Sequence, residues 1–281
     1  MGEAELRRAI EELYQLPSDR LPADAEDRFL ELREKLSRGE IRAAQPSAHG
    51  WVVNAWVKKG ILLGFRLGRI ADFSMMQPPL RFFDKHTFPP RGLELEDQVR
   101  VVPGGSSIRD GSFIGRGVVC MPPMFVNVGA YVDEGTLIDS NALVGSCAQI
   151  GKRVHLSAGA QIGGVLEPVG AMPVIIEDQV LVGGNCGVYE GTIVKKEAVL
   201  APGTILTRGT PVYDLVNETT LRASGEAPLT IPRGAVVVPG SRPARGSFAA
   251  RENLHLYAAM IVKYRDPGTD AAVALEDALR Q

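Results

Sequence analysis

Cysteine is scarce in this chain of 281 residues, which holds only Cys120, Cys147 and Cys186. The three form an odd set, and no two of them have the spacing of a metal-binding pair. We therefore expect small buried side chains in a reducing compartment rather than a metal site.

Net charge and long apolar runs are also missing. The chain carries 31 Lys and Arg against 33 Asp and Glu, which gives a formal charge of −2, and it has no block of like charge. This balance argues against a nucleic-acid partner and against a charged tail. Neither an apolar N-terminal stretch nor a membrane-spanning run is present, so we expect a cytoplasmic protein with no membrane partner.

A strong six-residue repeat fills the middle of the chain. One apolar or cysteine side chain recurs at every sixth position, namely Val102, Ile108, Ile114, Cys120, Val126, Val132, Ile138, Val144, Ile150, Leu156 and Ile162. A helix repeats its inner face every 3.6 residues and a strand every two, so this period fits neither. It is instead typical of a coil whose successive sides are equivalent.

The rest of each hexad supports the same interpretation. Four residues after the apolar position the chain usually places a small residue, as at Ser106, Ser112, Ala130, Thr136, Ala142, Ala148 and Ala160. Asp, Gly, Ser and Asn stand between them, and these residues tolerate the left-handed backbone of a sharp corner. Each hexad is then a short strand plus a corner, and three hexads close one eighteen-residue turn. The predicted fold is mainly β, a left-handed parallel β-helix.

The repeat is interrupted once. Ile176 follows Ile162 by fourteen residues, two more than two hexads, and the new phase then holds at Val182, Val188, Val194, Leu200, Leu206 and Val212. The interruption predicts a loop near 167–174 that bulges from one corner, a usual place for function on a repetitive scaffold. A polar excursion near 214–230 is either a surface hairpin or another loop. After it, IPRGAV and VVPGSR supply two final hexads.

The flanks follow helical patterns. AELRRAIEELYQL and PADAEDRFLELREKLSRGE place apolar residues three and four apart, and WVVNAWVKKGILLGFRL predicts a third helix that ends near Gly64 or Gly68. At the other end, LYAAMIVKYRD resembles a strand and AAVALEDALRQ a closing helix. We therefore expect a mainly helical domain at 1–100, the β-helix at 101–242 and a C-terminal cap at 243–281.

A longer match points to one family. The stretch MFVNVGAYVDEGTLIDSNALVGSCAQIGKRVHLSAGAQIGGVLEP, followed by PVIIED, closely resembles tetrahydrodipicolinate N-succinyltransferase, a hexapeptide-repeat acyltransferase of diaminopimelate and lysine biosynthesis. Similar segments are WVKKGILLGFRL, RFFDK, VRVVPG, AVVVPGS and AMIVK. The resemblance implies a homotrimer with active sites between subunits. It also implies succinyl-coenzyme A as the acyl-donor substrate, with no permanently bound cofactor.

The implied reaction acylates an amine. The amino group of ring-opened tetrahydrodipicolinate, 2-amino-6-oxopimelate, attacks the thioester of succinyl-coenzyme A. This requires an unprotonated amine, a group that takes its proton and donors for the oxyanion, but no covalent enzyme intermediate.

Two site residues follow from the motifs that carry the resemblance. Arg100 in VRVVPG matches a substrate-binding arginine, whose fork of donors suits a carboxylate. Asp139 in LIDSN matches the aspartate that binds the acceptor's amino group, and we take it as both a catalytic and a binding candidate. The alternatives are a solvated or salt-bridged Arg100 and a plain turn residue at 139, since Asp133 stands at the same repeat position.

The chain departs from the family pattern at two positions. The register places Gly187 where the resemblance implies a glutamate proposed as the base, and the nearest acid is Glu190. Glu190 is therefore the second catalytic candidate, below Asp139, with a structural role as the alternative. Asn141 stands where some members have a bulky aromatic residue, which leaves the shape of the acceptor pocket and the choice of acyl group open.

Coenzyme A would need cations or backbone donors for its phosphates. Lys195, Lys196, Arg208 and Arg233 lie on the later coils, and Gly183, Gly184 and Ala201 allow close approach to the pantetheine arm. Their alternatives are solvated corner cations and ordinary corner residues.

Four other functions occur to different degrees as alternatives on such a scaffold. An acetyl-coenzyme A-dependent N-acetyltransferase stays open, because one arginine or a few backbone donors suffice to recognise the extra carboxylate of succinate. Acetyltransferases of this fold that use a histidine base would have only His155 in the coils, and a zinc-dependent carbonic anhydrase would need three histidines there. A non-catalytic assembly protein predicts monotonous hexads, without the loop and flanking domains expected here.

Overall fold

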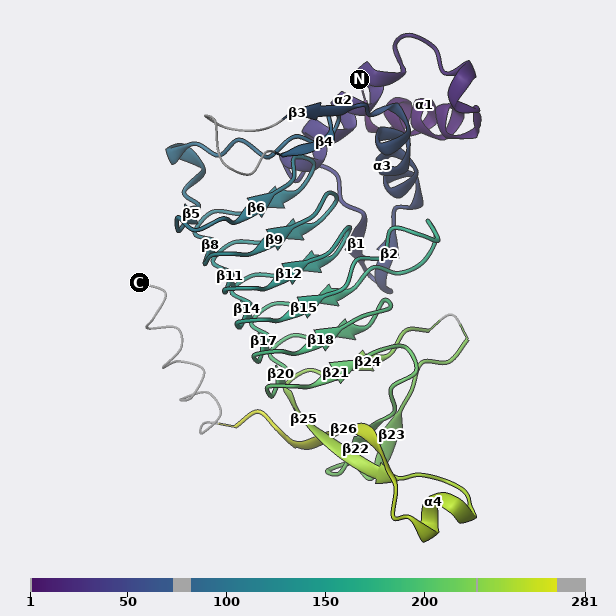
Figure 1. Ribbon diagram of the computed structural model, residues 1–281, viewed down its shortest axis with the longest axis vertical. Helices are drawn as coiled ribbons and strands as arrows, with labels where there is room; N and C mark the ends of the chain where they lie inside the picture. The colour runs from purple at the N-terminus through teal and green to yellow at the C-terminus, as the bar shows by residue number, and fades with distance from the viewer. Residues whose placement is uncertain (1, 73–81, 226, 267–281) are drawn as a thin grey trace.

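A three-sided prism of very short strands forms the body of the protein (Figure 1). The computed structural model describes residues 2–72, 82–225 and 227–266. The first face is the stack β5 (Arg100–Val101), β8 (Val119–Cys120), β11 (Leu137–Ile138), β14 (His155–Leu156), β17 (Leu181–Val182), β20 (Val199–Leu200) and the start of β25 (Ala235–Pro243).

Two further stacks complete the prism. The second face is β6 (Ser107–Ile108), β9 (Phe125–Val126), β12 (Leu143–Val144), β15 (Gln161–Ile162), β18 (Gly187–Val188) and β21 (Ile205–Leu206). The third is β7 (Phe113–Ile114), β10 (Tyr131–Val132), β13 (Gln149–Ile150), β16 (Ile175–Ile176), β19 (Ile193–Val194) and β24 (Thr230–Ile231). Neighbours in each stack pair in parallel, and the chain visits the faces in turn.

The apolar hexad residues form the core of this prism. From Ile108 to Val212, each residue that the repeat marks is at most 7% exposed, and nearly all are fully buried in one continuous cluster. The small partners pack between them: Ser112, Thr136 and Ala148 are completely buried. The prediction of a left-handed parallel β-helix is confirmed.

The first hexad breaks the register. The strand β5 pairs with β8 so that Val101, not Val102, lies opposite Cys120, and Val102 stays partly exposed outside the core. The assignment of Val102 to the core was therefore wrong. Since this terminal strand has a neighbour on one side only, less packing holds its register than holds that of an inner coil.

The interruption is larger than predicted. The strands β15 and β16 follow each other directly, with no strand between them. Ile162 pairs with Val188, twenty-six residues on, whereas Val144 pairs with Ile162 at the usual eighteen, so eight residues are inserted rather than two. The insertion lies in the segment 163–174, called the inserted loop below.

The end of the β-helix also differs from the expectation. The excursion holds a hairpin of β22 (Val212–Asp214) and β23 (Thr219–Leu221), one of the two forms considered. IPRGAV contributes β24 as expected. VVPGSR forms no corner, because β25 leaves the first face and pairs antiparallel with β26 (His255–Tyr264), with α4 (Ser247–Arg251) between them. The predicted closing helix at 271–281 lies outside the described residues.

Three helices form the N-terminal part: α1 (Glu3–Gln15), α2 (Ala25–Ser37) and α3 (Ala55–Leu67). Gly60 and Gly64 of α3 let α2 approach closely, since a Cβ there would lie 2.1 Å from Leu32 and 2.2 Å from Phe29. WVV of the third predicted helix belongs to a strand instead, so that helix starts at Ala55. None of the helices in the described ranges is long and apolar enough to cross a membrane.

Short elements lie between the helices and between α3 and the prism. They are η1 (Ser18–Arg20), β1 (Ala44–Ser47), β2 (Gly50–Val53), β3 (Ile70–Asp72), β4 (Phe83–Lys85) and η2 (Leu95–Asp97). The β1–β2 hairpin covers the third face: Ala44 and Trp51 pack against Ile175 and Ile193. The domain boundaries at 100 and 242 stay a prediction.

Candidate functional site

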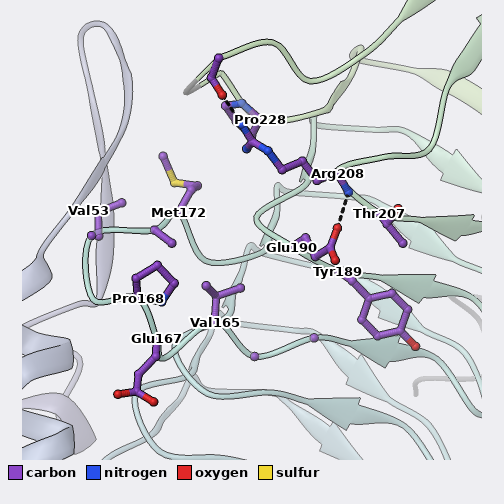
Figure 2. A pocket seen from close by; sticks show the side chains of 15 residues that line it. Val53, Val165, Glu167, Pro168, Met172, Tyr189, Glu190, Thr207, Arg208 and Pro228 are labelled. Carbon is purple, nitrogen blue, oxygen red and sulfur yellow. Dashed lines mark hydrogen bonds between the residues drawn. The ribbon is translucent and has the colours of Figure 1, made fainter.

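A groove of about 1080 Å³ opens at the corner between the second and third faces (Figure 2). Its walls come from β2, the inserted loop, two corners of the prism and the returning excursion. The lining residues are Val53, Gly163, Gly164, Val165, Glu167, Pro168, Gly170, Ala171, Met172, Tyr189, Glu190, Thr207, Arg208, Gly225 and Pro228. The predicted loop therefore forms one side of this groove.

Two predicted residues, Glu190 and Arg208, meet in this groove. They follow β18 and β21, so they lie on the same edge of the prism in neighbouring coils. The Glu190 Oε2 accepts a hydrogen bond of 2.9 Å from the Arg208 backbone N–H. The Arg208 guanidinium reaches across the groove and donates to the Gly225 carbonyl (Figure 2). Glu190 thus has a structural contact, while its exposed carboxylate still faces the groove.

Asp139 lies at a different corner, between the first and second faces. It follows β11 and is partly exposed, and its Oδ1 accepts a hydrogen bond of 2.7 Å from the Ser140 N–H. Asp133 makes the same turn with Glu134 at 2.8 Å. The turn therefore explains an aspartate at 139 on structural grounds, and only one carboxylate oxygen is used, so the other can meet a ligand.

Arg100 is on the first face, near the Asp139 corner. It is exposed in β5, which pairs with β8, and β8 pairs with β11 just before Asp139. Two strand spacings of roughly 4.8 Å separate the levels of the two residues. The register also places Arg100 level with Leu137, two residues before Asp139.

The Asp139 corner continues as a ladder toward Gly183, Gly184 and Ala201. Backbone bonds link its steps, from Asp139 to Leu156 and from Gly183 to Leu200. The Gly183 and Ala201 amides donate to carbonyls within this ladder, so they are not free to bind the pantetheine arm. The Gly184 amide has no acceptor among the residues described, which leaves it as the donor of the three.

The other candidate cations are held by acids. Lys195 pairs with Glu177 at 2.9 Å, on the corner after the third face. Arg233 makes two hydrogen bonds to Glu197, at 2.9 and 3.1 Å, and Lys196 lies 3.9 Å from the same carboxylate. None of the three lines the groove. Their contacts favour the structural alternative, whereas Arg208 remains the cation available in the groove.

Gly187 is covered by an aromatic ring. A Cβ at Gly187 would lie 2.5 Å from Tyr189 Cε2, so Tyr189 fills the space where a larger residue's side chain would begin. The ring points away from Pro168 and Met172 (Figure 2). Asn141 also has a local explanation: its φ is 62°, a left-handed corner that suits asparagine better than an aromatic residue.

Sequence reasoning missed several lining residues, among them Val53, Glu167, Tyr189 and Thr207. The repeat located their corners and the loop, but a six-residue period does not show which corner a loop or a distant hairpin covers.

The cysteines are unsuited to nucleophilic chemistry. All three are free and buried, as predicted. Burial raises the pKa of both Cys120 and Cys147 to about 12, and burial likewise raises the pKa of Cys186. A thiol in this state stays protonated at neutral pH and is a poor nucleophile.

Comparisons with known proteins agree across the chain. Residues 5–67 match the family described as "Tetrahydrodipicolinate N-succinyltransferase N-terminal", and residues 173–208 match "Hexapeptide repeat of succinyl-transferase". A protein of Aromatoleum aromaticum is 45% identical, covering 97% of this chain and 96% of its own. One of Paraburkholderia xenovorans is 44% identical, covering 97% and 95%. Both are named 2,3,4,5-tetrahydropyridine-2,6-dicarboxylate N-succinyltransferase.

Proposed function

The chain belongs to the tetrahydrodipicolinate N-succinyltransferase family, and we propose that it moves the succinyl group of succinyl-coenzyme A to the amino group of 2-amino-6-oxopimelate. This reaction serves diaminopimelate and lysine biosynthesis. The observation that supports this function best is that the chain aligns over nearly its full length with relatives named tetrahydropyridine-dicarboxylate N-succinyltransferase.

The chemistry needs positioning rather than a covalent intermediate. The amine nitrogen attacks the thioester carbonyl, a C–N bond forms, and the C–S bond breaks as the tetrahedral intermediate collapses. The amine loses one proton, and the departing thiolate of coenzyme A gains one, so the balance is neutral. A carboxylate near the amine accepts its proton in transit and a backbone N–H stabilises the oxyanion.

We assign the acceptor to the first-face corner. Asp139 holds the amino group through its unused carboxylate oxygen, and Arg100 binds a carboxylate of the same molecule. The Gly184 amide, on the same corner, is the proposed backbone donor for the acyl-donor arm. Arg208 in the groove is the proposed cation for a phosphate of coenzyme A.

These residues divide between two edges of the second face. Asp139 and Gly184 are at its beginning, whereas Glu190 and Arg208 are at its end. A side of six residues spans roughly 15–20 Å, so Asp139 and Glu190 do not meet within one chain. We therefore propose a homotrimer in which the Asp139 edge of one subunit faces the Glu190 edge of the next.

The first test compares two aspartates in equivalent turns. Acceptor-dependent release of the coenzyme A thiol from succinyl-coenzyme A is measured for the wild type, Asp139→Asn and Asp133→Asn. An asparagine keeps the turn bond in both, so the fold is preserved. We expect about a hundredfold loss of kcat in Asp139→Asn only. Equal activity of the two variants would show that Asp139 is a turn residue, and no release by the wild type would reject the enzyme.

A mixing experiment tests the shared site. Asp139→Asn and Glu190→Gln are co-expressed with different affinity tags, and the mixed oligomers are purified. If each site takes one residue from each of two subunits, about a third of the sites, one in each mixed trimer, regain both residues. Recovery of activity over either variant supports the assignment. No recovery, or a fully active Glu190→Gln protein, contradicts the role of Glu190.

Acyl specificity is tested directly. We expect a kcat/KM for succinyl-coenzyme A well above that for acetyl-coenzyme A with the same acceptor, and the reverse preference would select the acetyltransferase alternative. The cytoplasmic location remains a prediction.

A further inference from the structure

A charged side chain is completely buried beneath the groove. Lys58 lies in α3, and none of its surface is exposed. Its neighbours in sequence and space belong to the apolar N-terminal core, which includes Val57, Ile61 and Cys147. Burial lowers its pKa, an effect only partly offset by the nearby Cys147.

Within the described part of the chain, the Lys58 ammonium has one hydrogen-bond partner. Its Nζ donates a hydrogen bond of 2.5 Å to the carbonyl of Ala171, which is 113 residues further along the chain. Ala171 belongs to the inserted loop and lines the groove, whereas Lys58 does not line it. The contact therefore runs from the helical part to the back of the groove wall.

The stability of the core does not explain this lysine. An ammonium loses most of its hydration on burial, and one neutral carbonyl compensates for little of that loss. A methionine of similar length would fill the space without this penalty. A buried charge retained at such a cost suggests a role outside the core.

The inserted loop is also held on both sides of this contact. Near its start, the Val165 N–H donates to the Ser146 carbonyl at 3.2 Å, and near its end Met172 packs against the third-face cluster. Between them, Glu167, Pro168 and Gly170 are exposed, and the recorded backbone bond is the turn from Ala171 N–H to the Pro168 carbonyl. Leu166 of the loop also packs against the helical core, so the Lys58 bond adds a polar contact between the helical part and the loop, at the residue before Met172.

We propose that Lys58 is a positioning residue that clamps the inserted loop through Ala171 and so sets the shape of the groove in which the donor binds. The catalytic part of this inference rests on the proposed function, while the clamp itself does not.

The test compares neighbouring lysines on one helix. Lys58→Met removes the donor and keeps the length of the side chain. Lys59→Met is the matched control, since Lys59 pairs only at 3.9 Å with Glu11. Amide hydrogen exchange is followed for Leu166 to Met172, together with KM and kcat for both substrates. Lys58→Arg keeps a charged donor and serves as the conservative variant.

We expect exchange in the loop to be about tenfold faster in Lys58→Met than in Lys59→Met, with the prism strands unchanged. The KM for the acyl donor should rise about fivefold or more with a smaller change in kcat, and Lys58→Arg should recover part of both. Unchanged loop exchange would overturn the clamp. Faster exchange with unaltered kinetics would overturn the positioning role. If the wild type shows no succinyl transfer, the proposed function fails while the exchange result still decides the clamp.

Discussion

The contact between Gly187 and Tyr189 gives a quantitative prediction. A Cβ added at Gly187 would lie 2.5 Å from Tyr189 Cε2, whereas ordinary contacts begin at 3.4 Å, so the ring must move by about 1 Å. The backbone is not the obstacle, because Gly187 does not have a left-handed φ. Moving the ring off its preferred rotamer in a packed position should cost about 1–2 kcal/mol of unfolding free energy.

A double-mutant cycle isolates this contact. Gly187→Ala should destabilise the wild-type background by that amount. In a Tyr189→Ala background the same change should be neutral or stabilising by about 0.4–1 kcal/mol, because alanine restricts the unfolded chain. Gly209→Ala is the control: its nearest neighbour for an added Cβ is Thr207 Oγ1 at 3.8 Å. Urea unfolding of the four cycle proteins and the control gives the coupling energy.

The ring displacement should also change the groove, because Tyr189 lines it. We expect Gly187→Ala and Gly187→Glu to lower kcat/KM in the presence of Tyr189. In the unfolding cycle, the effects of Gly187→Ala and Tyr189→Ala should not be additive. If their unfolding free energies add within about 0.5 kcal/mol, as those of independent sites do, the steric explanation is refuted.

Two further predictions concern buried titratable groups. The thiols of Cys120, Cys147 and Cys186 should resist alkylation in the native protein at pH 8 and react only on unfolding, because burial raises the pKa of each thiol. Mass spectrometry of the labelled protein measures this. Rapid labelling of the native protein would contradict the packing. Burial lowers the pKa of Lys58 from its ordinary 10.5, so the folded protein loses this proton at a lower pH than the unfolded chain. The unfolding free energy of the wild type should therefore rise with pH between the lowered pKa and 10.5. The Lys58→Met protein should therefore be at least as stable as the wild type at pH 7 and should lose that advantage toward pH 10.5. Urea unfolding at several pH values measures the difference in stability between the two proteins. A difference that does not depend on pH would argue against a buried ammonium.

The prism was predictable because its core is periodic in sequence. A residue such as Ile150 is buried by its six-residue phase alone, and each neighbour in the stack repeats the same requirement. The phase fails where that repetition ends. Val102 follows the terminal strand β5, which lies at the end of its stack. Val237 still pairs with Leu200 in the core, but beyond it β25 continues antiparallel to β26, a partner outside the repeat.

The site was less predictable because its walls are not periodic. Asp139 and Glu190 were named as candidates from their motifs, but the sequence does not show that their corners are opposite edges of one face. Lys58 and Ala171 are separated by 113 residues, and neither hexad phase nor helix pattern connects them. A role for Glu167 in the groove could not be predicted, because the fourteen residues from Ile162 to Ile176 are compatible with several loop lengths.

The ladder that runs from Asp139 through Ser157 and Gly183 to Ala201 makes the scaffold a molecular ruler. Each step along it is one coil, or roughly 4.8 Å, and the coils before and after the inserted loop keep their register. The distance between the proposed acceptor end and the proposed donor end is therefore fixed by a whole number of coils. One complete coil added between Ser157 and Gly183 would lengthen the reach of the site by a single increment and leave each set of contacting residues unchanged.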